Sequence, residues 1–329
     1  MSKPSLMLST FVKIVSYRAG FLGLLHRKRN RRTLTAVMFH RVLSAGDPRW
    51  TGADPEYTLE TSLFEQCIEF LQQHYNFVSL QDVLDARANL RPLPDRALLV
   101  TFDDGWADNA EYALPILHAK RIPAVMFVVA DAVGTQQPFW QERLRSAELR
   151  GFAAPPPFDS WSAVHAALQA MPADHRSQWM LEHDEALDDA QRQMVDLADL
   201  VNLQDGGVAL GLHGKSHVPM REAADLHAEL EGARETLGNL LAEAGRPAPS
   251  ATMSFPHGSY DAIVADKARA AGYQLAFTSV PGLNAIDPSP SWLLARTGFE
   301  AAAVTDMEGR FRPYLLALYL FRRPVKRLA

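Results

Sequence analysis

The feature that most constrains the fold is the alternation of short apolar runs with longer segments of helical periodicity along the chain. Such alternation is typical of βα units, which assemble into a mainly parallel sheet or barrel covered by helices. Six runs are expected to be strands: 34–39, 97–102, 124–129, 207–212, 251–255 and 275–278. Helices are expected near 60–74, 80–88, 108–120, 220–244 and 260–271.

One long segment, residues 131–205, breaks this alternation. It contains a Pro-rich stretch at 153–158, and the rest has the pattern of polar helices that carry tryptophans. We interpret the segment as a helical insertion between two consecutive βα units. Two of its tryptophans, Trp140 and Trp161, are candidates to wall a cleft and stack on sugars, although tryptophans in helices more often belong to a core.

The charge of the chain is distributed unevenly. Of its 329 residues, 1–46 hold nine Lys or Arg and 309–329 hold six, with no acid in either segment. The body between them, 47–308, carries 18 basic and 38 acidic residues. An acidic body repels phosphate, so we expect no nucleic-acid partner. The basic ends instead suit peripheral contact with an anionic membrane.

Both ends of the chain combine these cations with apolar residues. Residues 6–25 place apolar side chains near helical spacing and are followed by the basic cluster 27–32, and the apolar run 314–321 is followed by basic residues in the same way. Each end fits either an interfacial amphipathic helix or a terminal helix packed on the body. The apolar residues at the first end are Met7, Phe11, Ile14, Val15, Phe21, Leu22 and Leu25.

Membrane spans and export signals are not expected. No stretch approaches the roughly 20 apolar residues that cross a bilayer, and basic residues 27–32 stand where a signal peptide needs a small-residue cleavage site. We therefore expect a cytoplasmic protein, peripheral at the inner membrane face.

The single cysteine, Cys67, excludes an intramolecular disulfide. We divide the chain into a basic amphipathic segment (1–33), a barrel domain (34–307) and a basic apolar tail (308–329).

Polar groups able to bind a metal follow three of the expected strands, at the edge where parallel α/β folds bind ligands. Asp103 and Asp104 follow the strand 97–102; taken alone, Asp-Asp-Gly is more often a turn or helix cap. His213 and His217 follow 207–212 with the His-x-x-x-His spacing of metal ligands, although a lone histidine pair is more often structural. His257 lies in a Pro- and Gly-shaped turn that could aim a backbone N–H into a site.

In this order, the three segments resemble the first three motifs of the polysaccharide deacetylases, the carbohydrate esterase group that contains the NodB homology domain. The resemblance covers about residues 34–130 and 205–300. The matching stretches are 101–105, 213–217 and 255–258, with 37–42 similar to a Tyr-His-Arg-Val strand and 294–299 similar to a late Leu-Pro-Arg strand.

The resemblance implies an irregular (β/α) barrel and one divalent metal, usually zinc. On this sequence the implied ligands are Asp104, His213 and His217, and the implied general base is Asp103. Three protein ligands leave an open position for water and substrate, as a catalytic zinc requires. A bound metal polarises the acetyl carbonyl and lowers the pKa of water, while the base accepts the proton of that water. The family suggests that the backbone N–H of His257 holds the oxyanion.

The chain also departs from the family pattern. Ser254 stands where the third motif commonly has an arginine, so Arg296 is the candidate to orient the base. The late Leu-x-His motif that supplies the general acid in many members is not recognisable, since residues 296–329 contain no histidine. His40 or His257 could donate the proton instead. The alternative for His40 is a hydrogen-bonded wall of the pocket.

The leading hypothesis is a metal-dependent deacetylase. Its substrate would be an N-acetylated, or less commonly O-acetylated, sugar of a polysaccharide or lipid-linked glycan precursor, met during assembly of a surface glycan. Two alternatives stay open. The missing acid fits a catalytically silent glycan-binding protein, and the same chemistry fits a metal-dependent amidase acting on a different amide.

Overall fold

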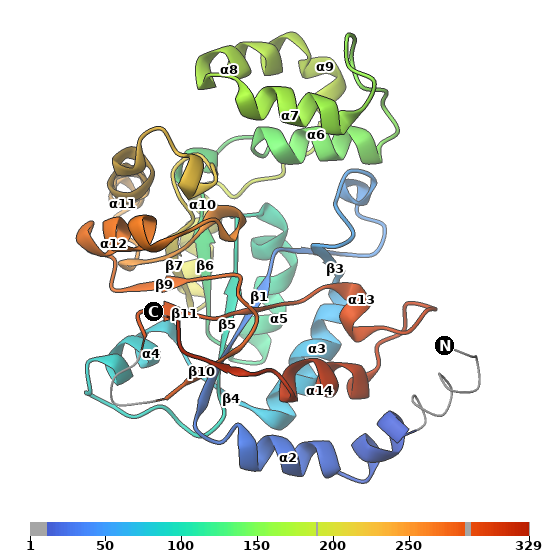
Figure 1. Cartoon of the computed structure of the whole chain (residues 1–329), viewed down its shortest axis with the longest axis vertical. Coiled ribbons are helices and arrows are strands. Elements are labelled where there is room, and N and C mark those ends of the chain that lie inside the picture. Colours follow the sequence, from blue (N-terminus) through green and yellow to red (C-terminus); the bar gives the residue numbers. More distant parts are fainter. Residues whose placement is uncertain (1–11, 189, 287–290, 329) are drawn as a thin grey trace.

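The computed structural model describes residues 12–188, 190–286 and 291–328 and has helices packed around one mainly parallel sheet (Figure 1). Six strands pair in parallel in the order in which the chain forms them. The six predicted strands are confirmed, and each end lies within one residue of its expected position. They are β1 (Thr33–Phe39), β5 (Ala97–Phe102), β6 (Ala124–Val128), β7 (Val208–Leu212), β8 (Thr252–Ser254) and β9 (Leu275–Phe277).

Shorter strands extend this sheet at its margins. β10 runs antiparallel to β1, and β2 and β3 form a separate parallel pair. The short strands are β2 (Arg41–Leu43), β3 (Thr58–Glu60), β4 (Asn76–Phe77), β10 (Leu283–Ala285), β11 (Leu293–Leu294), β12 (Thr297–Gly298) and β13 (Val325–Lys326).

One short segment connects the two sides of the six-strand sheet. β11 pairs with β9, and β12, which begins three residues after β11 ends, pairs with β1. The circuit of strands is therefore completed through Ala295 and Arg296, where the ladder is interrupted. This arrangement agrees with the expected irregular barrel and places the Arg296 side chain inside it, over the ring of Phe127 at 5.6 Å.

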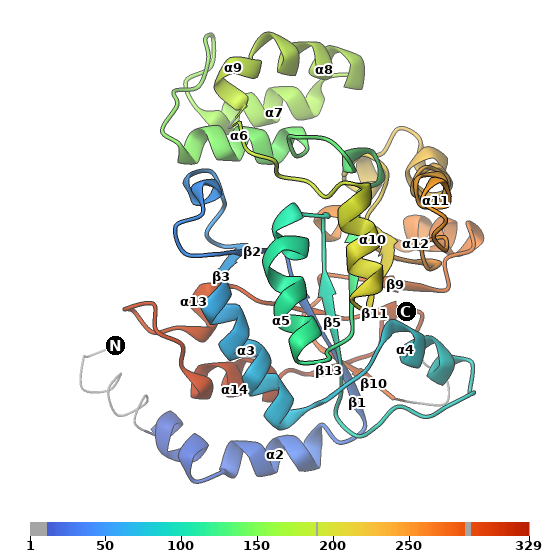
Figure 2. The same cartoon turned by 180° about the vertical axis from the view of Figure 1, so that it is seen from behind.

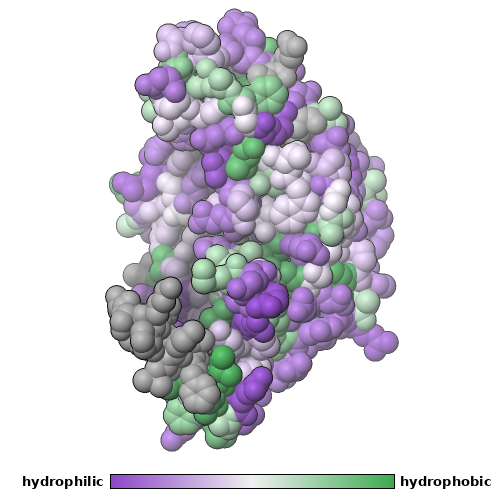
Figure 3. Space-filling view, turned by 90° about the vertical axis from the view of Figure 1, so that its right-hand side faces the viewer, coloured by the Kyte–Doolittle hydropathy of each residue, from purple (hydrophilic) through white to green (hydrophobic). Residues whose placement is uncertain are grey.

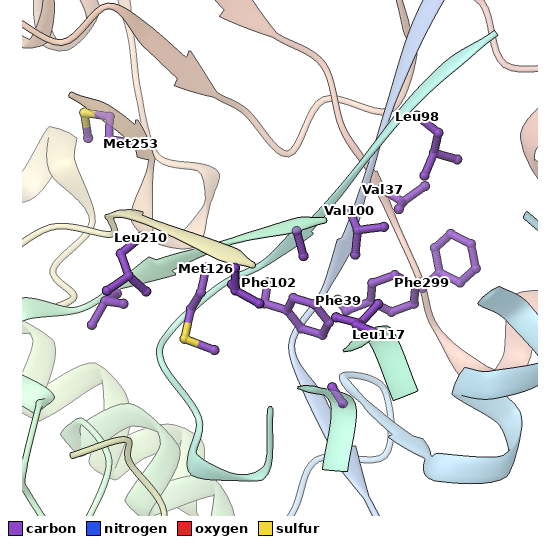
Figure 4. Packing of buried hydrophobic residues seen from close by; sticks show 14 of the residues in the cluster. Val37, Phe39, Leu98, Val100, Phe102, Leu117, Met126, Leu210, Met253 and Phe299 are labelled. Atoms are coloured by element: carbon purple, nitrogen blue, oxygen red, sulfur yellow. The ribbon is translucent and has the colours of Figure 1, made fainter. Parts of the chain in front are cut away.

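Both faces of the six strands are buried. Strand residues that alternate along the chain divide between an inner cluster, with Leu99 and Phe127, and an outer cluster that faces the helices. Figure 4 shows the outer cluster, in which Phe102 lies beside Met126 of the neighbouring strand and which also includes Leu117 of a covering helix. Because both faces are apolar, polar groups gather where the strands end.

Most of the helices surround the sheet, as the two opposite views show (Figures 1 and 2). The helices are α2 (Phe21–Arg29), α3 (Thr61–His74), α4 (Leu80–Arg87), α5 (Leu114–Ala119), α6 (Trp140–Leu149), α7 (Trp161–Ala170), α8 (Ala173–Glu182), α9 (Asp184–Leu187), α10 (Leu197–Asp205), α11 (Ala233–Glu243), α12 (Ala262–Ala270), α13 (Ala301–Val304) and α14 (Pro313–Phe321). Short 3-10 turns occur at 48–51, 130–132, 220–222 and 256–258, and π-helical turns at 109–113 and 228–232 lead directly into α5 and α11.

The segment predicted as a helical insertion, 131–205, contains α6 to α10. Of these, α10 packs on the body, with Leu200 and Leu203 in its core. The helices α6 to α9 lie beyond the carboxyl ends of the strands (Figure 1). These helices share a small core of their own, which includes Trp161, Val164 and Leu168. The guanidinium of Arg145 on α6 pairs with Asp54 of the body at 2.8 Å. These four helices thus form a separate layer held against the carboxyl ends of the strands.

One predicted helix, 220–244, begins later than expected. Residues 220–222 form a single helical turn, 223–225 are not helical, and the continuous helix starts after Asp225, whose carboxylate accepts the backbone N–H of Ala228 at 3.1 Å. A side chain that caps the first turn fixes where a helix can start. The predicted start at residue 220 is therefore wrong.

The two terminal segments pack side by side. α14 contacts α2, and the side chain of Asn30 donates to the backbone carbonyl of Phe321 at 3.0 Å. Of the predicted amphipathic segment, Met7 and Phe11 lie outside the described residues. Among the residues described, no helix is both long and apolar enough to span a bilayer.

Candidate active site

The first site segment follows β5, where the chain turns sharply. Asp104 and Gly105 both have left-handed backbone angles, with φ of 78° and 91°. Glycine adopts such angles readily and other residues rarely do. The turn leaves the side chains of Asp103 and Asp104 buried at the carboxyl end of β5. Two adjacent buried carboxylates require compensating positive charge.

The second segment follows β7 and forms a loop between two histidines. The buried carboxylate of Glu229 accepts the backbone N–H groups of Lys215 at 2.8 Å and Ser216 at 3.0 Å. It also accepts the hydroxyl of Ser216 at 2.5 Å. These bonds fix the curvature of the loop, which returns His217 to the side of His213.

Both histidines converge on one carboxylate. The Nε2 atoms of His213 and His217 each lie 3.3 Å from Oδ1 of Asp104, and one ligand atom of each residue lies within 4.8 Å of the others. All three side chains are buried. Burial alone would raise the pKa of Asp104, but the two histidines hold it well below its usual range. Two imidazoles and a carboxylate are a donor set that fits zinc.

The environment of each histidine sets how it can bind a cation. Nδ1 of His213 faces the hydroxyl oxygen of Ser254 at 2.5 Å and the carbonyl oxygen of the same residue at 3.0 Å, so a proton on Nδ1 donates to Ser254 and leaves Nε2 free. Nδ1 of His217 is buried without a hydrogen-bond partner in the described structure. The ring of Phe139, from the insertion, stacks on His217 at 3.8 Å. Aromatic packing therefore holds the second imidazole.

The expected base is paired with the expected arginine. The guanidinium of Arg296 donates two hydrogen bonds to Asp103, at 2.6 and 2.7 Å, and a third to the carbonyl of Thr278 at 3.0 Å. Ser254 donates its hydroxyl to Asp103 at 3.1 Å. Burial would raise the pKa of Asp103, but the charge and hydrogen bonds of Arg296, together with nearby His213 and His40, lower it. Asp103 is therefore ionised at neutral pH.

The other two candidate histidines occupy different surroundings. His40 follows β1 and lines the same cavity as both aspartates, with its ring 4.9 Å from that of Tyr57. His257 has a left-handed φ of 55°, and its Nε2 faces the carbonyl of His217 at 3.3 Å. Burial, together with the neighbouring His217, lowers the pKa of His257 to about 4. Its imidazole is thus neutral at physiological pH.

These residues surround a cavity of about 390 Å³ at the carboxyl ends of the strands. Trp106 is the tryptophan among its described lining residues, whereas Trp161 is buried in the core of the insertion and Trp140 packs on His165 and Arg176. The proposed sugar-stacking role of Trp140 and Trp161 is therefore not supported. Glu142 of α6 lines the cavity instead, and burial raises the pKa of its carboxyl to about 7.

A larger cavity, of about 670 Å³, lies away from these residues, near the start of β1. Its described lining is apolar and basic, with Leu34, Trp292 and Arg269 among its members, and includes no histidine or acid. Size alone would select this cavity, but the convergent titratable groups lie in the smaller one. We assign the candidate active site to the smaller cavity on that chemistry.

Three residues of the site had no signal in the sequence: Glu229, Phe139 and Glu142. Phe139 and Glu142 come from the insertion, whose position over the sheet depends on tertiary packing. Glu229 sits within a helix, where a single acid looks like an ordinary surface residue. Asp108 was missed in the same way; it forms a buried ion pair at 2.9 Å with Arg41, which belongs to the stretch 37–42 that resembles the family's Tyr-His-Arg-Val strand.

Comparison with known proteins gives one family match. The family model described as polysaccharide deacetylase matches residues 91–276, which is more than half of the chain. The poly-beta-1,6-N-acetyl-D-glucosamine N-deacetylase of Escherichia coli K12 is 31% identical over 102 residues, 30% of this chain and 14% of that protein. The putative polysaccharide deacetylase YxkH of Bacillus subtilis is 22% identical over 99 residues, 30% of this chain and 34% of its own. The chain therefore matches only a minor part of either relative.

Solved structures share the fold. The Streptococcus pyogenes deacetylase PplD superposes with a TM-score of 0.59 at 15% identity, and the match covers 88% of this chain and 99% of that one. IcaB from Ammonifex degensii superposes with a TM-score of 0.57 at 18% identity, and the match covers 88% of this chain and 97% of IcaB. At these identities the likeness establishes the common architecture of the chains.

Proposed function

The chain belongs to the polysaccharide deacetylase family, and from that premise we propose that it is a metal-dependent deacetylase that releases acetate from N-acetylated sugars. The observation that carries the proposal is the placement of Asp104, His213 and His217 around one point, next to the Asp103–Arg296 pair, in a single cavity. Ligands and base thus lie where one substrate can reach both.

We propose that Asp104, His213 and His217 hold one divalent cation, with zinc the preferred ion for two imidazoles and a carboxylate. The buried, convergent donor atoms support this assignment. When bound, such an ion polarises a carbonyl group and lowers the pKa of a water molecule. Glu229 and Phe139 then act by fixing the loop and the ring that present the histidines.

Asp103 is the proposed general base. Its carboxylate is ionised and lies beside the proposed cation ligand Asp104, so it can accept the proton of the attacking water. Arg296 is a positioning residue, because its two hydrogen bonds fix the orientation of the carboxylate. The backbone N–H of His257 is the proposed donor to the oxyanion that forms when water adds to the acetyl carbon.

We assign the general acid to His40 rather than to the His257 side chain. A departing sugar amine needs a proton, and the donor must be protonated near neutral pH. The Nε2 atom of His257 is directed at a backbone carbonyl, and its pKa of about 4 leaves the ring neutral. His40 lines the same cavity as the proposed base and the proposed cation ligands.

For the substrate we propose an N-acetylhexosamine unit of a polysaccharide or a lipid-linked glycan precursor, with O-acetyl groups a less favoured target. The family membership and the similarity to an enzyme named for poly-β-1,6-N-acetylglucosamine support a role in exopolysaccharide synthesis. We also propose that the protein works at the inner membrane face, with its basic termini toward anionic lipid.

Acetate release tests this proposal directly. Purified protein would be assayed on N-acetylglucosamine oligomers, lipid-linked sugars and nucleotide sugars, with and without a chelator. Chelator-sensitive release from an oligomer or lipid-linked sugar supports the proposal. Metal and sugar binding without acetate release would indicate a silent glycan-binding protein, and hydrolysis confined to non-sugar amides would indicate an amidase. Asp103→Asn should abolish release while the protein still binds metal.

A further inference from the structure

The helix α2 has two faces of different character. Its buried face carries Leu22 and His26, and the His26 ring stacks on Phe321 of α14 at 4.0 Å. Its outer face carries two large apolar side chains, Phe21 and Leu24, which are 63% and 59% exposed. Because the inner face is anchored to α14, these two side chains are held out in water rather than free to fold back.

Cations stand on the same outer face. Arg27 and Lys28 are exposed, and Lys28 lies four residues after Leu24, so the two share one side of the helix. Neither cation forms an ion pair with an acid among the described residues. The first acidic residue of the chain is Asp47, so the sequence around α2 is uniformly basic.

The short helical segment before α2 repeats the pattern. Tyr17 packs inward, with its ring stacked on that of Phe70 at 6.4 Å. On the outer side Val12 and Val15 are 54% and 45% exposed, and Lys13 and Arg18 are exposed beside them. In Figure 3, hydrophobic and hydrophilic side chains lie next to each other at the lower end of the molecule, where these segments run.

The fold also adds the basic end of the chain to this surface. The guanidinium of Arg29 donates to the backbone carbonyl of Arg323 at 3.1 Å, across 294 positions of sequence. Arg322, which follows α14, is exposed. The two acid-free segments of the sequence are therefore joined into one surface, while the acidic residues lie in the body.

We infer that this surface, formed by residues 12–28 and Arg322, docks the protein on an anionic lipid bilayer. Exposed apolar side chains interleaved with cations are the composition of an interfacial membrane-binding face. The inference rests on the membrane placement proposed above and deepens it by naming the docking surface; vesicle binding requires no catalysis, so it is tested separately from deacetylation. α2 lies at the opposite end of the sheet from the carboxyl ends of its strands, so docking leaves the catalytic cavity open to water (Figures 1 and 2).

Vesicle sedimentation of the full chain tests the inference. The protein should sediment with vesicles that contain phosphatidylglycerol and stay in solution with phosphatidylcholine vesicles, and added salt should release it. Equal binding to both vesicle types, or no binding to the anionic ones, would overturn the inference. Binding to a soluble polyanion such as heparin but not to vesicles would also overturn it and would indicate a polyanionic partner.

Variants locate the surface. Arg27→Gln with Lys28→Gln should weaken binding to anionic vesicles by about five-fold per cation removed, roughly 25-fold together. Phe21→Gln with Leu24→Gln should weaken it by at least about ten-fold. Binding of either double variant at the wild-type level would place the contact elsewhere and contradict the inference.

The matched control variants remove side chains of the same two kinds, apolar and cationic, from other surfaces of the molecule. Leu181→Gln with Ile263→Gln removes two apolar side chains that are 69% and 66% exposed, and Lys267→Gln with Arg269→Gln removes two exposed cations. These variants should bind as the wild type does. The melting temperature of each variant reports whether it folds. If an α2 variant does not fold, the lipid and salt series on the wild-type protein still decides the inference.

Discussion

Arg296 and Asp103 lie 193 positions apart in the chain and face each other through two hydrogen bonds, Nη1 to Oδ1 at 2.6 Å and Nη2 to Oδ2 at 2.7 Å. Both side chains are buried, so the pair is shielded from solvent. Asp104, next in sequence, faces two histidines instead. The two adjacent carboxylates are thereby given different partners and different proposed roles.

Replacing Arg296 with Gln should raise the pKa of Asp103, because the cation that favours the carboxylate form is lost. The base then stays protonated to a higher pH, so the acid limb of the kcat/KM profile should move to higher pH. Loss of one partner of a buried pair should also destabilise the fold by about 3–5 kcal/mol. The Arg296→Lys variant keeps the positive charge, so its acid limb and its stability should lie between those of the wild type and of Arg296→Gln. An unchanged acid limb in a folded Arg296→Gln protein would show that Arg296 does not set the pKa of the base.

Replacing His40 with Gln should slow amide hydrolysis by about 10²–10⁴-fold, the usual contribution of a general acid. Aryl acetates have leaving groups that need no proton, so their hydrolysis should be far less affected. His257→Gln keeps the backbone N–H and should affect the two substrate classes alike. Comparable losses on amide and aryl ester for His40→Gln would show that His40 forms a wall of the cavity instead.

Replacing Glu229 with Ala should weaken metal binding by about 10–100-fold, because the loop between the two histidines loses its three hydrogen bonds. Glu231 lies on the same helical segment and pairs with His227, so Glu231→Ala is the matched control. Competition with a chromophoric chelator measures both. Equal metal affinities for the two variants would mean that the loop holds its shape without Glu229.

The contact between α2 and α14 should be sensitive to acid. Burial lowers the pKa of His26 to about 4, whereas an unfolded histidine titrates near 6.5. The unfolded state therefore binds the proton first, and stability that is complete above pH 6.5 is lost as the pH falls toward 4. By pH 5 this amounts to about 2 kcal/mol. Urea unfolding of His26→Gln at pH 7 and 5 should show a smaller decrease than the wild type, and an equal decrease would contradict the assignment.

Much of the fold follows from local pattern. β5 is a continuous apolar run from Ala97 to Phe102 because both of its faces are buried, and such runs are visible in sequence. Helix starts depend on single capping contacts, which is why the helix that follows His217 begins at its Asp225 cap rather than at residue 220. The stretch 294–299 resembles a late strand of the family, but local pattern does not predict that residues 293–298 pair with both β9 and β1, which are distant in sequence.

The residues of the site likewise divide into those that the sequence predicts and those that only the tertiary structure brings to the cavity. Asp103, Asp104, His213 and His217 stand out because groups able to bind a metal follow successive strands in the order of the family's motifs. The structure brings these residues together and places Arg296, the predicted partner of the base, beside Asp103. Glu142 and Phe139 reach the cavity only because the insertion folds back over the strand ends, a tertiary contact that residue type and spacing do not encode.

The most direct test of the account is a metal titration of chelated protein, with acetate release from an N-acetylglucosamine oligomer and elemental content measured on the same samples. The account predicts that release is absent without metal, rises with added zinc and levels off at one ion per chain. Full release from protein shown to contain no divalent metal would contradict it.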